Sequence, residues 1–246
     1  MSFSIYKWPC VVVVCSASLA FALTVSTIAA RASNANPGVL PPNSHAFGKT
    51  YGGWSAAWWQ YVESQPVSSN PLLDSTGAGC RAAQSGSVFF LVGANGSGSV
   101  TRDQCTVPVG KALFFPLLNA SNIEPAKTPL GAWEELEGAF GPFSELHASV
   151  DGRALANLDP ATTPYRVCAG PVARCSAPSF SVFLPAENFF GTPEGTYEPT
   201  VADGFYALLT PLSPGPHTIS FGGTGLFLGG PFSQDITYHL VVVSGG

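Results

Sequence analysis

Two histidines near the C-terminus are the side chains whose types and spacing most directly suggest chemistry. If the apolar runs that contain His217 and His239 pair as a hairpin centred on residue 228, the two imidazoles lie directly opposite each other. Opposed imidazoles on one sheet face can bind a transition metal, with Asp235 or His45 as a further ligand. A slip of one residue would move a side chain to the other face, and opposed histidines can also be mere surface neighbours. No other cofactor is predicted.

Carboxylates supply a second candidate chemistry, because glycoside hydrolysis uses a pair of them. Glu135 belongs to an acidic cluster on a short predicted helix, and Glu124 lies in a predicted loop. Together with His217 they are the candidate catalytic residues of an extracellular hydrolase, lyase or His-dependent metalloenzyme. Acidic residues at a helix start are more often solvated partners of the helix dipole. The chain contains neither a GxSxG nucleophile motif nor a GxxxxGK[ST] phosphate loop.

Aromatic side chains are concentrated in the stretch YGGWSAAWWQYV, residues 51–62. Trp54, Trp58 and Tyr61 are spaced i, i+4 and i+7, which predicts a helix with these rings on one face, packed against a sheet. Trp59 is about 100° away from Trp58 around such a helix. It is therefore the ring that we expect to contact a ligand, as aromatic side chains do in many binding modules.

Polar residues follow the apolar run 111–118. Asn119 and Asn122 lie where this predicted strand ends, together with a serine and a glutamate. Amide and hydroxyl groups at the end of a strand can line a ligand pocket. They are also common turn formers, so both interpretations stay open.

Short apolar runs separated by Gly, Pro and Asp-Gly turns predict the strands that would position these residues. The dipeptide Asp151-Gly152 is typical of a hairpin turn. A second, short helix is expected at 132–140. The fold class is therefore all-β, an antiparallel β-sandwich or jelly roll with one N-terminal helix and one short inserted helix. The expected strands are 87–93, 97–101, 111–118, 146–150, 153–157, 178–184, 205–210, 216–222 and 234–243.

The N-terminal residues 1–32 have the organisation of a secretory signal peptide. They carry Lys7, then a long apolar run, then Ala30-Arg31-Ala32. A secreted or periplasmic protein is expected, and a membrane would be a partner only through an uncleaved leader. Residues 33–85 then form an N-terminal segment whose Trp-rich helix packs on the sandwich, and residues 86–246 form the β-sandwich domain.

Four cysteines follow the leader, an even number that favours disulfides in an exported protein. The pairs Cys80 with Cys105 and Cys168 with Cys175 close the shortest loops and are the expected bonds. Zinc is the alternative, but no CxxC pair or Cys/His cluster of finger-like spacing is present.

Net charge excludes one class of partner. The chain carries a net charge of −5, and charged residues make up only 10% of it. Because an acidic protein without a basic stripe repels phosphate backbones, nucleic acid is not expected to bind.

Several stretches resemble a group of uncharacterised secreted bacterial proteins that have a Trp-rich N-terminal segment and a β-rich body. They are YGGWSAAWWQYV, VTRDQCTVPVGKALFFPLLNA, PLSPGPHTISFGG and DITYHLVVV. The resemblance implies export and a β architecture, and it implies no activity.

Low charge, the expected disulfides and 12% aromatic residues favour a binding protein over an enzyme. The leading hypothesis is a secreted β-sandwich that binds a polysaccharide or a cell-envelope component. The alternatives are the extracellular hydrolase, lyase or metalloenzyme described above, and a structural subunit of an envelope or matrix.

Overall fold

Alternation of apolar and polar residues builds the long strands. Along the last strand Ile236, Tyr238 and Leu240 are buried, whereas Asp235 and His239 between them are exposed. Because successive side chains point to opposite faces of a strand, this pattern gives one face to the core and one to solvent. The hydrophobic core therefore lies on one side of this sheet.

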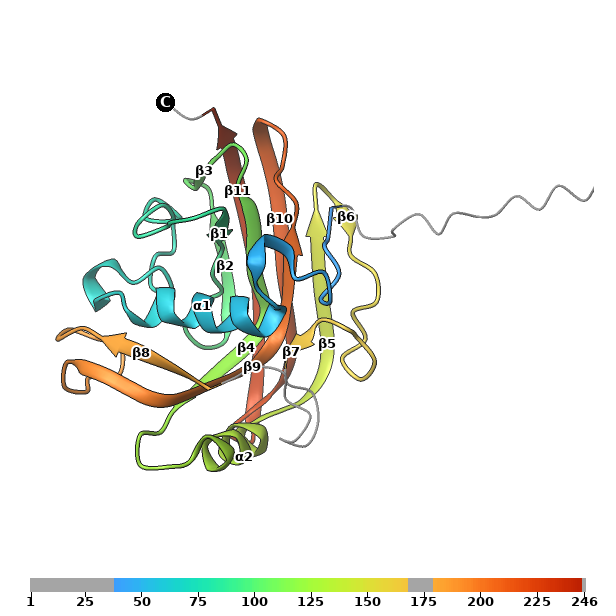
Figure 1. Ribbon diagram of the computed structural model, residues 1–246. Coiled ribbons are helices and arrows are strands. Elements are labelled where there is room, and N and C mark those ends of the chain that lie inside the picture. The colour runs from blue at the N-terminus through green and yellow to red at the C-terminus, as the bar shows by residue number, and fades with distance from the viewer. Residues whose placement is uncertain (1–37, 168–178, 245–246) are drawn as a thin grey trace, which may run out of the picture. The chain divides into compact units, whose positions relative to one another are not determined.

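The computed structural model describes residues 38–167 and 179–244, which form two β-sheets and two α-helices (Figure 1). The helical elements are η1 Ala46–Gly48, α1 Tyr51–Glu63, η2 Val67–Ser69 and α2 Pro129–Ala139. The strands are β1 Val88–Phe90, β2 Gly98–Arg102, β3 Thr106–Pro108, β4 Ala112–Ile123, β5 Phe140–Val150, β6 Arg153–Ala154, β7 Arg166–Val167, β8 Phe180–Leu184, β9 Gly195–Leu209, β10 Gly215–Phe227 and β11 Gly230–Val243.

The strands form a sandwich of two sheets. The first sheet has the order β1-β4-β9-β7, with β8 also paired to β9, and the second has the order β2-β11-β10-β5-β6, with β3 also paired to β11. The long strands pair in the antiparallel sense, while the short strands β1, β2 and β3 join in parallel. The predicted fold class, an all-β sandwich with one N-terminal helix and one short inserted helix, is confirmed.

Several strand boundaries differ from those predicted. Strand β4 continues to Ile123, so the polar residues after Leu118 belong to the strand and not to a loop. Strand β9 begins at Gly195, ten residues before the predicted start. The two strands pair with each other along this polar extension, and these ladder hydrogen bonds hold a sequence that has little β propensity of its own. The predicted turn at Asp151 and Gly152 is confirmed, with φ of 50° and 74°.

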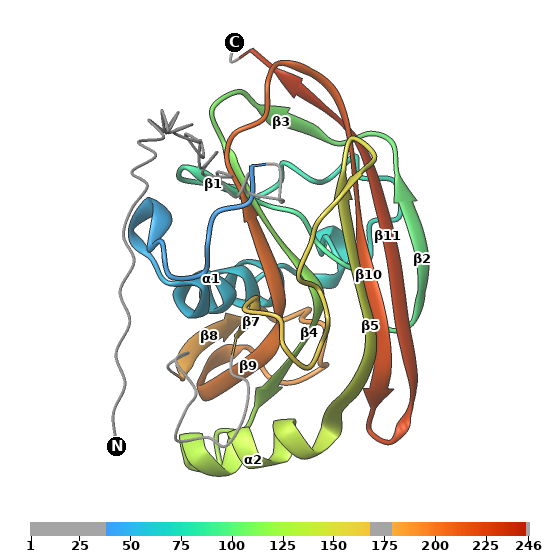
Figure 2. The same ribbon diagram turned by 90° about the vertical axis from the view of Figure 1, so that its right-hand side faces the viewer.

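Helix α1 covers the outer face of the first sheet. Figure 2 shows β4 and β9 between this helix and the sheet of β5, β10 and β11. Thr50 caps the helix by accepting a hydrogen bond from the backbone N–H of Gly53 at 3.0 Å. Trp54, Trp58 and Tyr61 are all buried, as their spacing predicts. Helix α2 lies against β4, β5 and β9 at one end of the sandwich.

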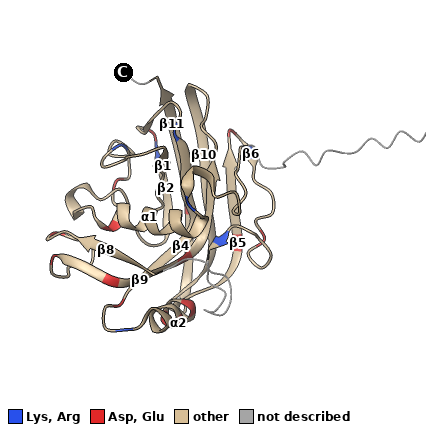
Figure 3. Cartoon of the chain, viewed as in Figure 1, with Lys and Arg blue, Asp and Glu red and all other residues tan. Residues whose placement is uncertain are grey.

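Charged residues are sparse on the described chain. Figure 3 shows Lys and Arg scattered singly over the part of the chain that the structure describes, without a basic stripe. Arg166 is paired with the buried Asp203 through two hydrogen bonds, of 3.2 and 2.8 Å. None of the helices within residues 38–167 and 179–244 is long and apolar enough to cross a membrane.

A disulfide joins Cys80 and Cys105, one of the two predicted bonds. Both cysteines are buried, and the bond fastens the segment before β1 to the turn before β3. The predicted partners Cys168 and Cys175 lie outside the described residues, as does the predicted leader.

Replacing both Cys80 and Cys105 with Ala will lower the free energy of unfolding by about 3 kcal/mol. The bond closes a loop with a sequence separation of 25, and a cross-link of this length removes that much entropy from the unfolded chain. Urea unfolding of the oxidised wild type and of the double variant measures the difference. An unchanged midpoint would show that the cross-link contributes nothing to stability.

Candidate functional site

A cavity of about 370 Å³ lies beside helix α1. Its walls come from α1, the segment after η2, the loop after β1, β4, the start of β5, the loop between β8 and β9, and the β10–β11 hairpin. Seven aromatic side chains line it: Trp58, Trp59, Phe140, Phe189, Phe190, Phe227 and Phe232. This volume is within the range of small-molecule sites.

The sheet topology creates the cavity. Strand β1 pairs with β4 only along Ala112–Phe114, so the rest of β4 has no strand neighbour on that side among the described residues. Residues 119–121 of this free edge line the cavity. Phe190 and Phe227 are 44% and 36% exposed, which places them where the cavity meets solvent.

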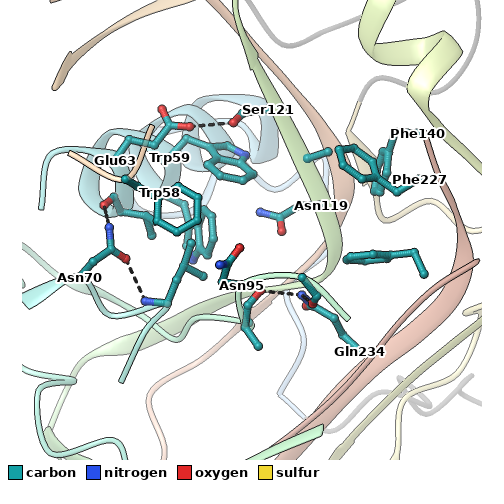
Figure 4. A pocket seen from close by; sticks show the side chains of 18 of the residues that line it. Trp58, Trp59, Glu63, Asn70, Asn95, Asn119, Ser121, Phe140, Phe227 and Gln234 are labelled. Atoms are coloured by element: carbon teal, nitrogen blue, oxygen red, sulfur yellow. Dashed lines mark hydrogen bonds between the residues drawn. The ribbon is translucent and has the colours of Figure 1, made fainter. Parts of the chain in front are cut away.

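Trp59 and Asn119, two of the residues predicted to bind a ligand, both line the cavity. The indole N–H of Trp59 and the amide of Asn119 donate to the hydroxyl of Tyr206 at 3.2 and 3.3 Å. Burial raises the pKa of Tyr206, so this hydroxyl stays neutral. Figure 4 shows Asn119 between the two tryptophans and the pair formed by Phe140 and Phe227. Trp59 is only 8% exposed, so it forms a cavity wall and not an external platform.

Glu63, the last residue of α1, is an ionisable side chain that lines the cavity. It is 2% exposed, and its Oε1 accepts a hydrogen bond of 2.7 Å from the hydroxyl of Ser121 (Figure 4). Its Oε2 is buried and has no hydrogen-bond partner among the described residues. Burial raises the pKa of Glu63 to about 8, and the bond from Ser121 lowers it only in part. Burial therefore favours the neutral form of this carboxyl group.

Two other polar residues of the wall are occupied in holding the backbone. Asn70 donates to the carbonyl of Val62 at 3.0 Å and accepts from the N–H of Leu72 at 3.0 Å. Gln234 donates to the carbonyls of Ala94 and Gly96 at 2.7 and 2.9 Å. Glu63, Asn119 and Asn95 of the wall keep hydrogen-bonding capacity for a ligand.

Arg102 holds together two loops behind this wall, the loop that contains Asp74 and the loop after β1. It is 1% exposed and donates to the carbonyls of Asp74, Val92 and Gly93 at 2.7, 3.1 and 2.8 Å. Its guanidinium group also lies over the ring of Tyr238, 5.1 Å from the centroid. Arg102 thus positions the loop after β1. This role of Arg102 was not predicted from the sequence.

The other residues predicted from the polar and acidic segments lie outside the cavity wall. Asn122 donates to the carbonyl of Ala132 and to Glu135, at 3.1 and 2.9 Å, and so fastens α2 to β4. Glu135 also pairs with Lys127 at 2.6 Å on the surface. The backbone carbonyl of Glu124 accepts from the N–H of Lys127, and its side chain does not line the cavity. None of the three predicted catalytic residues, Glu124, Glu135 and His217, lines the cavity.

The predicted register of the histidine hairpin is wrong by one residue. His217 pairs with Leu240, and His239 pairs with Thr218, so the two imidazoles lie on opposite faces of the sheet. The turn at residues 228 and 229, both with positive φ, is centred half a residue later than expected.

Each of these imidazoles instead contacts an aspartate. His217 is 2.8 Å from Asp151, and His239 is 2.6 Å from Asp103. Asp235, a proposed further ligand, lies 3.3 Å from His147. The other proposed ligand, His45, is an exposed residue beside η1. Within residues 38–167 and 179–244 no three His, Cys, Asp or Glu side chains are placed to hold a metal ion.

No protein-family model matches the chain, and neither a curated protein nor a solved structure is significantly similar to it.

Proposed function

We propose that this protein binds a small extracellular ligand in the cavity beside α1. The observation that carries the proposal is that the cavity combines an aromatic wall with polar groups that can still form hydrogen bonds to a ligand. Flat apolar surfaces bind the body of a ligand, and a few fixed polar groups orient it. The disulfide between Cys80 and Cys105 supports export, because such bonds persist in oxidising compartments.

A sugar unit or another small envelope component suits this wall. Aromatic rings pack against the apolar face of a sugar ring, and Asn95 and Asn119 offer amide groups to its hydroxyls. The burial of Trp59 favours a compact ligand or a chain end over a long polysaccharide laid on the surface.

Binding is favoured over hydrolysis by the distribution of carboxylates. Glycosidases of the common type hold two carboxyl groups on either side of the scissile bond. Glu63 is the single acidic side chain among the described residues that line the cavity. A lone neutral acid with no second carboxylate is better suited to hold a ligand than to cleave one.

Replacing Ala94 with Trp will weaken ligand binding by at least about tenfold, because the half-buried Ala94 lines the cavity and a bulky side chain there occupies its volume. Ligand-observed NMR with a panel of monosaccharides and small amines measures binding to each variant. Ala161→Trp is the matched control, since Ala161 lies in an exposed loop outside the cavity. The same compounds binding equally to both variants, or no compound binding to the wild type, would refute the proposed site.

A further inference from the structure

The free oxygen of Glu63 is the unsatisfied group of the cavity. Its Oε1 is held by Ser121, whereas its Oε2 is buried without a partner among the described residues. A buried polar atom that lacks a hydrogen bond is costly, and a ligand that supplies the missing partner recovers that cost. Glu63 also ends helix α1, where the helix dipole disfavours a negative charge. The position is therefore poor for an isolated carboxylate and suited to one that is neutralised by a ligand.

The remaining wall defines the chemistry of that ligand. No Lys, Arg or His side chain of the described residues lines the cavity, so an anion has no counter-charge there. Aromatic faces attract cations through their ring quadrupoles, most strongly for Trp, and cages of such rings are the usual sites for organic ammonium groups. Trp58 and Trp59 lie beside Glu63 on the same helix, with their rings 4.8 Å apart and nearly perpendicular.

We infer that the ligand is an organic cation, a small amine or amino sugar whose ammonium group pairs with Glu63 and packs against the tryptophan rings. This inference rests on the proposed function and specifies the ligand class of the same cavity. Amides such as Asn119 then bind the neutral part of the ligand.

Binding of the cation releases one proton. In the free protein Oε2 keeps its proton, and the ammonium group replaces it while the proton passes to the buffer. Neighbouring groups do not obscure this exchange. Ser121 on β4, which donates to Glu63, does not titrate. Tyr206 on β9, whose hydroxyl is bonded to Trp59 and Asn119 of the cavity, stays neutral because burial raises its pKa. Since a cation binds only the ionised form, its apparent affinity should rise about tenfold from pH 6 to pH 7.

Calorimetric titration with two pairs of compounds tests the inference. Choline is compared with its uncharged analogue 3,3-dimethylbutan-1-ol, and glucosamine with N-acetylglucosamine. Choline keeps its charge at every pH, so its pH profile reports the titration of Glu63 alone. We expect at least one charged member to bind at least tenfold more tightly than its neutral partner. Glu63→Gln, which keeps an acceptor for Ser121, should weaken cation binding at least tenfold at pH 8, while Glu134→Gln on the exposed face of α2 leaves it unchanged.

Other outcomes separate this inference from the proposed function. Two results would overturn the inference that the ligand is a cation: neutral members that bind as tightly as charged ones, or cation binding that survives Glu63→Gln. Either result would still leave a ligand site that Ala94→Trp blocks. Binding without proton release at pH 6.5 would also overturn it. Failure of the entire monosaccharide and amine panel would remove the proposed function as well.

Discussion

Replacing Glu63 with Gln will raise the free energy of unfolding by about 3 to 5 kcal/mol at pH 8.5 and change it little at pH 4. The pKa of Glu63 is raised to about 8 in the folded protein by burial, from an ordinary value of 4.5. The unfolded chain therefore loses this proton near pH 4.5, whereas the folded protein keeps it. Stability falls as pH rises between these two values and levels off above the folded pKa.

Urea unfolding of wild type and Glu63→Gln, from pH 4 to pH 9 without added ligand, measures this effect. The glutamine cannot ionise, so the difference between the two curves isolates the carboxyl group. Glu134→Gln is the control, because this exposed residue of α2 should change stability by less than about 0.5 kcal/mol at each pH. Parallel curves for wild type and Glu63→Gln would contradict the buried, unpaired state of the carboxyl.

Replacing Arg102 with Met will cost about 3 to 5 kcal/mol of stability. Methionine retains much of the packing volume but removes the donors, so the buried carbonyls of Asp74 and Gly93 lose their partner. Each unsatisfied buried group costs roughly 1 to 3 kcal/mol, and the contact with the ring of Tyr238 is lost as well.

Thermal and urea unfolding of Arg102→Met, compared with Arg153→Met, tests this expectation. Arg153 is exposed in β6, so its replacement should change stability by no more than about 0.5 kcal/mol. Because Gly93 also lines the cavity, ligand binding should weaken in Arg102→Met even at temperatures where the variant is folded. Two variants of equal stability would show that the buried guanidinium group does not hold these loops.

Periodicity predicted the parts of the fold that depend on local pattern. The i, i+4, i+7 spacing of Trp54, Trp58 and Tyr61 is enough to place them on the buried face of a helix, and alternation is enough to place β11. Register is different, because it depends on the turn. A shift of one residue between His217 and His239 leaves the apolar pattern of each strand unchanged, yet it separates the two imidazoles by the thickness of the sheet.

The cavity was predictable only in part, since its residues are distant in sequence. Trp59 and Asn119 are predictable because each departs from its local sequence pattern. Trp59 lies off the apolar face of the helix, and Asn119 follows directly after an apolar run. The same kind of signal marks Glu63, an acid in the last turn of a helix, where the dipole disfavours it. Nothing local marks Arg102, because its role depends on loops that tertiary packing brings to it.

The cavity beside α1 is expected to hold the ligand, with Glu63 as its polar anchor. A crystal structure of the protein with the tightest-binding compound of the panel tests this expectation. We expect the compound in the cavity, with its ammonium group beside Glu63 Oε2 and its body against Trp59. A compound bound elsewhere on the surface, with only water in the cavity, would contradict it.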